Sequence, residues 1–116
     1  MKDELPHIDD ALVADLKELM AEDFEFLVRS FVKDSKDRLT GIKEKLTEQD
    51  AMEFSRACHS FKGSASNVGA VRLADLCLQG ERKGADRDLS RADELLLDMT
   101  REFSLVADAL HDTLTG

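Results

Sequence analysis

The chain has 116 residues, the size of one compact domain, so a catalytic domain beside a separate substrate domain is not expected. Hydrophobic residues make up 42%, with no Trp, no Tyr and a single Pro, a composition that favours helix over strand. The formal net charge of -9 argues against nucleic acid and anionic membranes as partners.

Membrane spans, secretion signals and cysteine frameworks are not expected. No apolar stretch approaches the roughly 20 residues of a transmembrane helix, and the N-terminal segment lacks the apolar core of a signal peptide. We therefore expect a soluble, cytoplasmic protein. Cys58 and Cys77 lie 19 residues apart, a pattern too sparse for a disulfide framework or a zinc cage. We expect both thiols in the core and predict no metal site.

The first predicted element is a short helix that begins near Asp9 or Asp10, because either carboxylate can cap a helix N-terminus. Leu12, Leu16 and Leu19 follow at helical spacing and form its expected apolar face. Such a short helix suits packing across one end of a larger assembly.

A second, longer helix is predicted from about Glu22 to Thr47. Gly41 lowers its helix propensity without ending it. Its apolar residues recur every three or four positions and form one stripe, made of Phe24, Leu27, Val28, Phe31, Val32, Leu39, Ile42 and Leu46.

A third helix is predicted to open at a capping box formed by Asp50 and Glu53. Gly69 supplies its stop signal. Its apolar positions step by four and three residues in alternation and are Phe54, Cys58, Phe61, Ala65 and Val68.

Two further helices complete the predicted fold. The fourth covers about residues 70–83 and ends at Gly84, and the fifth opens after a capping Ser90. Their expected buried residues are Leu73, Leu76 and Cys77 in the fourth and Leu95, Leu96, Met99, Phe103, Val106 and Leu110 in the fifth. No strand pattern occurs, so we predict an all-α protein, an antiparallel up-down four-helix bundle with an additional short N-terminal helix.

His59 stands one step off the apolar stripe of the third helix. Its backbone is therefore anchored by buried neighbours, while its imidazole can reach solvent. Small, polar and cationic residues lie on the same side within one or two turns, namely Ser55, Arg56, Lys62, Gly63 and Ser66. We predict that Ser55, Arg56 and Ser66 line a surface for docking of partner proteins.

Lys62 and Gly63 are the neighbours on which the chemical prediction depends. Glycine inside a helix costs about 0.5 to 1 kcal/mol relative to alanine, and its missing side chain would open a notch beside His59. Lys62 would offset the charge of phosphoryl oxygens, and Ser64 and Ser66 would offer hydrogen-bond donors. A neutral imidazole is nucleophilic near pH 7, and a phosphoryl group on its nitrogen remains transferable to a carboxylate.

The charge distribution favours an acidic partner. Residues 56–83 carry a net charge of +3, and the rest of the chain therefore carries -12. A locally basic patch on an acidic protein suits a partner whose active site presents clustered carboxylates.

The segment ACHSFKGSASNVGA at residues 57–70 resembles the signature of histidine phosphotransfer (HPt) domains, H-x-x-K-G-x-[SA]-x-x-x-G. Every fixed position matches, with Phe61 where the family often has Leu, and the resemblance covers about residues 50–84. It implies a single HPt domain over residues 1–116, a four-helix bundle with His59 exposed mid-helix. Glu81 lies where the family often has a Gln or Glu that contacts the other ring nitrogen of the histidine, although it is otherwise explained as a plain surface carboxylate.

The resemblance further implies a phosphorelay intermediate that takes a phosphoryl group from a receiver-domain aspartate of a hybrid sensor kinase and passes it to a response regulator. No glycine-rich nucleotide-binding region is present, so ATP-dependent kinase activity is not expected. The chain would need no cofactor, because the partner receiver domains supply Mg²⁺, and would act as a monomer with transient partners.

The alternative function is a non-catalytic helical adaptor that binds partner proteins through an apolar groove. That interpretation leaves Gly63 unexplained. His7 and His111 lack cationic or glycine neighbours and are predicted to be ordinary surface residues.

Overall fold

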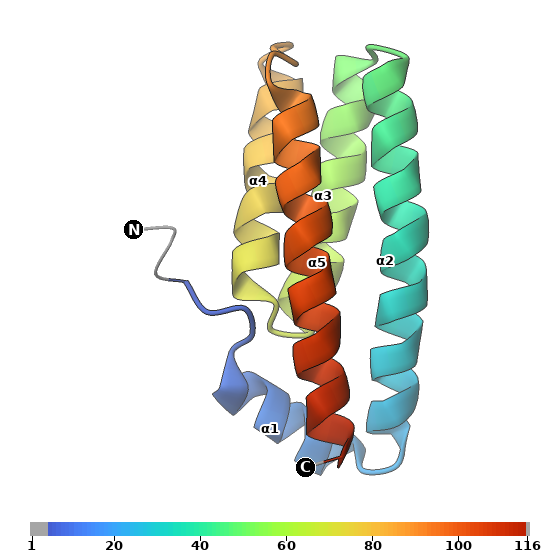
Figure 1. Cartoon of the computed structure of the whole chain (residues 1–116), viewed down its shortest axis with the longest axis vertical. Helices are drawn as coiled ribbons and strands as arrows, with labels where there is room; N and C mark the ends of the chain where they lie inside the picture. Colours follow the sequence, from blue (N-terminus) through green and yellow to red (C-terminus); the bar gives the residue numbers. More distant parts are fainter. Residues whose placement is uncertain (1–4, 116) are drawn as a thin grey trace.

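The computed structural model describes residues 5–115, which form five helices and no strand (Figure 1). The elements in chain order are α1 (Asp10–Met20), α2 (Asp23–Thr47), α3 (Ala51–Asn67), α4 (Val71–Ala85) and α5 (Ala92–Thr115). The last four lie side by side along the longest axis, and α1 lies across one end, beside the start of α2 and the end of α5 (Figure 1). The prediction of an all-helical protein is confirmed over this range.

The core lies between α2, α3, α4 and α5. Each of these helices presents an apolar stripe to the interior, as the sequence predicted. The largest fully buried side chains are Phe54, Phe61, Ile42, Leu73, Met99, Leu110, Val28, Val106, Cys58 and Cys77. Both cysteines are free, and burial raises the pKa of the Cys58 thiol to about 12.

Two aspartates begin helices as predicted. The Asp9 carboxylate accepts a hydrogen bond from the backbone N–H of Leu12, and Asp50 does the same for Glu53 at 3.1 Å. The carboxylate of Glu53 pairs with Arg56 one turn further along α3, so it is drawn away from the return bond of the predicted capping box.

Gly69 ends α3 as predicted. Its φ of +74° lies in the left-handed region that glycine adopts without strain. Its N–H donates to Ser66 O at 3.1 Å and the next N–H, of Ala70, donates to Ala65 O at 2.9 Å, which together make a Schellman motif. The Gly69 carbonyl accepts from the N–H of Asp9 at 2.8 Å, and this bond ties the start of α1 to the α3–α4 turn.

The predicted apolar face of α1 is wrong. Leu12 and Leu19 are 36% and 83% exposed, whereas Val13 is buried and Leu16 and Met20 are partly buried. α1 packs across the end of the other helices through the side that carries Val13, so only one of the three predicted leucines contributes to the core.

Two predicted helix ends also differ from the structure. α4 continues through Gly84 to Ala85, and Gly84 is buried inside it. Ser90 does not cap α5, because its hydroxyl and its N–H both donate to Asp88 Oδ1, at 2.5 and 3.1 Å. These bonds stabilise the α4–α5 connection and lower the pKa of Asp88.

The segment before α1 is fastened to α4 and α5. Arg72 donates two hydrogen bonds to the carbonyl oxygen of Leu5, and His7 Nδ1 lies 2.7 Å from Oε2 of the buried Glu102. Ile8 joins the core. The prediction that His7 is an ordinary surface residue is therefore wrong, because its side chain is partly buried and pairs with a carboxylate of α5.

Within residues 5–115, no helix combines the length and the apolarity that are needed to cross a bilayer.

Candidate functional site

His59 projects from the middle of α3 into solvent. Its side chain is 67% exposed, while Cys58 and Phe61 on the same helix are fully buried. The buried neighbours fix the backbone, and the imidazole remains accessible to a large partner.

Glu81 on α4 holds the side chains of His59 and Lys62 together. Its Oε1 atom lies 3.1 Å from His59 Nδ1 and 2.6 Å from Lys62 Nζ. The hydrogen bond from Lys62 lowers the pKa of Glu81, and the bond from His59 lowers it further, while partial burial opposes both. Glu81 is therefore a carboxylate at neutral pH.

This contact selects one tautomer of the His59 ring. A carboxylate only accepts hydrogen bonds, so Nδ1 of a neutral imidazole must carry the proton that it donates to Glu81. Nε2 is then the nitrogen with a lone pair. The arrangement can present Nε2 as a nucleophile and can stabilise the positive charge that develops on the ring when Nε2 forms a bond.

Gly63 leaves an open space one turn from His59. The residue is exposed, and a Cβ atom added to it would meet nothing within 4 Å. No contact in this structure therefore demands glycine here. The structure therefore shows open space at Gly63 itself, and the notch beside the imidazole stays a prediction.

The other predicted site residues lie further out. Arg56 is exposed and pairs with Glu53. Ser66 is exposed and Ser64 is partly buried. The structure thus brings Glu81 and Lys62 to His59, and leaves Arg56 and Ser66 as exposed side chains of the same helix.

The prediction that Ser55 lines a docking surface is wrong. The residue is buried between α3 and α4, and its hydroxyl donates to the backbone carbonyl of Glu81 at 2.8 Å. The helical spacing placed Ser55 one turn before His59, but it did not reveal how closely α4 approaches that side of α3.

Arg38 on α2 is a neighbour that sequence reasoning missed. Its guanidinium donates to the hydroxyl of Ser60, the residue that follows His59. It adds a cation on the α2 side of the helix that carries the histidine. Arg38 lies 21 residues before His59 on another helix, so no local spacing could have pointed to it.

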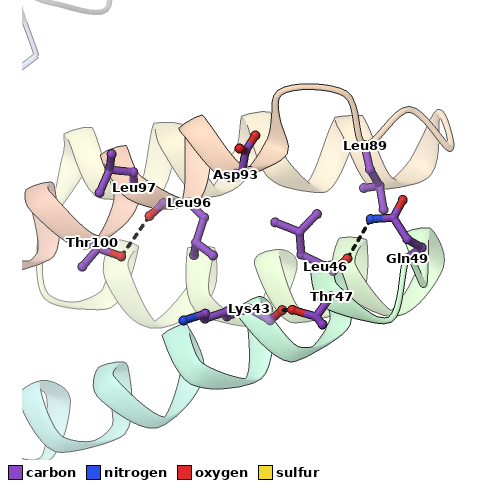
Figure 2. A pocket seen from close by; sticks show the side chains of 9 residues that line it. All are labelled: Lys43, Leu46, Thr47, Gln49, Leu89, Asp93, Leu96, Leu97 and Thr100. Atoms are coloured by element: carbon purple, nitrogen blue, oxygen red, sulfur yellow. Dashed lines mark hydrogen bonds between the residues drawn. The ribbon is translucent and has the colours of Figure 1, made fainter.

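A groove of about 620 Å³ lies between α2 and α5, at the end where the α2–α3 and α4–α5 connections meet (Figure 2). Its lining residues are Lys43, Leu46, Thr47, Gln49, Leu89, Asp93, Leu96, Leu97 and Thr100. The side chains of Thr47, Gln49 and Thr100 donate to backbone carbonyls at 2.9, 3.0 and 2.9 Å (Figure 2). Four leucines line the groove together with the charged side chains of Lys43 and Asp93. None of the lining residues belongs to α3 or α4, so the groove is separate from His59 and Glu81.

Among the described residues, no group of three or more His, Cys, Asp or Glu side chains is arranged to hold a metal ion.

Comparisons with known proteins point in the same direction as the geometry. The family model described as the Hpt domain matches residues 27–114. The crystal structure of histidine-containing phosphotransfer protein B from Pseudomonas aeruginosa PAO1 is similar to this chain, with a TM-score of 0.90 and 37% sequence identity. The match covers 95% of this chain and 96% of the other. Among curated proteins, no sequence matches significantly.

Proposed function

This chain belongs to the Hpt domain family, and from that membership we propose that His59 is the phosphorylated residue of a phosphorelay intermediate. It accepts a phosphoryl group from a receiver-domain aspartate of a hybrid sensor kinase and passes it to the aspartate of a response regulator. The observation that carries the proposal is the exposed imidazole whose Nδ1 is held by Glu81, with Lys62 on the same carboxylate oxygen.

In the proposed transfer, Nε2 of His59 attacks the phosphorus of the aspartyl phosphate. The N–P bond forms as the P–O bond to the aspartate breaks, and the aspartate leaves as a carboxylate. Glu81 accepts the hydrogen bond of Nδ1–H and offsets the positive charge of the ring, and Lys62 offsets the charge of the phosphoryl oxygens. The second transfer is the reverse of this step on another aspartate.

Hpt proteins are phosphotransfer intermediates rather than kinases, and we extend this to the present chain. We assign Mg²⁺ to the receiver domains, because the residues around His59 supply one carboxylate and two cations rather than a set of oxygen ligands. We propose a monomer in the cytoplasm, with receiver domains as its transient partners and neither nucleic acid nor membrane among them.

For the architecture we propose one Hpt domain over residues 1–116, built as an antiparallel up-down four-helix bundle of α2 to α5 with the short α1 across its end. Support comes from the side-by-side packing of the four helices and from the alternation of their connections between the two ends (Figure 1).

The test is transfer of label from a phosphorylated receiver domain. We expect the wild type to gain a phosphoryl group that is labile in acid and survives alkali, as a phosphoramidate does, and we expect His59→Gln to gain none. His111→Gln is the matched control, because His111 is exposed on α5. Equal labelling of the wild type and His59→Gln would overturn the proposal.

The second candidate is the adaptor function, which the leucine-lined groove between α2 and α5 favours (Figure 2). An adaptor would transmit its signal without covalent chemistry. In cells, its output would therefore persist in His59→Gln and disappear in Leu97→Asp, whose side chain lies in the groove. The relay predicts the opposite pair of results.

A further inference from the structure

Two glycines of α4 lie on either side of Glu81 and are both buried. Gly80 precedes Glu81 directly, and Gly84 follows it by three residues, close to one helical turn. Helix propensity disfavours both residues, since glycine in a helix interior is less favourable than alanine. The contacts of α4 with α3 explain why no side chain is present.

Gly84 lies against the backbone of α3. A Cβ atom on Gly84 would lie 2.5 Å from the carbonyl oxygen of Ala51 and 2.8 Å from the backbone nitrogen of Ser55. These are backbone atoms of a helix and cannot move aside as a flexible side chain can. A methyl group at residue 84 therefore has to move α4 away from α3.

Gly80 makes a related but softer contact. A Cβ atom there would lie 2.6 Å from Cys58 Sγ and 2.9 Å from Met99 Cε. The methionine can change rotamer, but the cysteine is a fully buried neighbour of His59. The close approach of α3 and α4 thus extends from Gly84 to the level of the histidine.

Ser55 adds a direct hydrogen bond at the same place. Its hydroxyl donates to the backbone carbonyl of Glu81 at 2.8 Å, and its Cβ would lie 2.7 Å from a methyl group on Gly84. The residue that Ser55 holds is the one whose carboxylate reaches His59. The backbone and the side chain of Glu81 are therefore both bound to α3.

We propose that Gly84 and Ser55 are positioning residues for phosphotransfer, which keep α4 close enough to α3 for Glu81 to hold Nδ1 of His59. The contact between Glu81 Oε1 and His59 Nδ1 is 3.1 Å, near the long end of the hydrogen-bond range, so a further separation of about 1 Å breaks it. Without this bond, the neutral ring favours the tautomer with the proton on Nε2, as free histidine does. That tautomer has no lone pair on the nitrogen that must attack.

The consequence for transfer rests on the proposed function, whereas the consequence for the His59 tautomer does not. The experiment therefore uses both readouts on the full chain. The tautomer of His59 is read from its ring nitrogen shifts by NMR in the unphosphorylated protein. Transfer is followed by stopped flow from a phosphorylated receiver domain.

We expect Gly84→Ala to remain folded, to shift His59 toward the Nε2–H tautomer and to slow transfer about tenfold or more. Ser55→Ala removes only the hydroxyl and should change both readouts in the same direction by a smaller factor. Gly41→Ala is the control, because a Cβ there meets nothing within 4 Å, and it should change neither readout. If Gly84→Ala does not fold, Ser55→Ala carries the test alone.

Combining each substitution with Glu81→Ala distinguishes a positioning role from a role in packing alone, because the Glu81→Ala protein has no carboxylate to position. If Gly84 and Ser55 act through Glu81, their substitutions should change the tautomer and the transfer rate by less than about twofold in that background. An unchanged tautomer in a folded Gly84→Ala or in Ser55→Ala would overturn the inference, as would an undiminished effect on transfer without Glu81. A shifted tautomer in a protein that accepts no phosphoryl group would instead overturn the proposed function alone.

Discussion

Lys62 of α3 and Glu81 of α4 form an ion pair, with Nζ and Oε1 2.6 Å apart. The pair crosses from one helix to the next, and the same oxygen lies against His59. Lys62 thereby brings a positive charge close to the histidine, although its side chain is only 28% exposed.

We expect Lys62→Ala to slow phosphotransfer about tenfold to hundredfold, because the phosphoryl oxygens lose the cation that offsets their charge. Stopped-flow mixing with a phosphorylated receiver domain measures the rate. Lys45→Ala is the matched control, since Lys45 pairs at 3.4 Å with Glu48, the residue after α2, and makes no contact with His59 or Glu81. Equal rates for Lys62→Ala and the wild type would contradict the prediction.

Stability should depend on pH through Glu81. Its pKa is lowered in the folded protein, chiefly by Lys62, so ionised Glu81 stabilises the fold above the ordinary carboxyl pKa, and this contribution is lost as pH falls through the lowered pKa. Urea unfolding of the wild type and of Glu81→Gln should therefore differ most near neutral pH. The difference in free energy of unfolding should shrink between about pH 6 and about pH 3. A difference that stays constant over this range would count against the ion pair.

Substitution of Gly63 should separate stability from transfer. Gly63→Ala should raise the free energy of unfolding by about 0.5 to 1 kcal/mol, because the helix gains propensity and the new methyl group meets nothing. Gly63→Gln should fold as well but transfer much more slowly, since its side chain would fill the space through which we propose that a receiver domain approaches His59. Thermal unfolding and stopped-flow transfer measure the two effects. Gly41→Gln, also at an open position, should keep the wild-type transfer rate.

Removal of the His7 ring should weaken the attachment of the segment before α1. His7→Ala takes away the group that lies 2.7 Å from Oε2 of the buried Glu102, and we expect a loss of about 1 to 3 kcal/mol in the free energy of unfolding. Urea unfolding measures the loss. Because the pair joins the N-terminal segment to α5, transfer from a receiver domain should stay at the wild-type rate, and a slower transfer would show that the two regions are coupled.

Features that depend on one helix at a time could be predicted from the sequence. Asp9 and Asp50 begin helices, because each carboxylate accepts a hydrogen bond from the backbone N–H three residues later. Gly69 ends α3 because it adopts a positive φ. The grouping of His59 with Lys62 and Gly63 follows from the helical repeat in the same way.

Features that depend on the distance between helices could not be predicted. Ser55 and Gly84 look like a surface residue and a stop signal in the sequence, and both are buried because α4 touches α3 at that level. Arg38 and the pair of His7 with Glu102 join residues far apart in the chain. The helical repeat of a single segment contains no information about which neighbour covers which side.

Thermal stability and signalling favour different residues at position 63, where the structure leaves open space. A laboratory selection for survival at high temperature would enrich side chains at this residue, since almost any of them makes a better helix than glycine does. The variants that such a selection retains would be more stable to heat and would transfer the phosphoryl group more slowly.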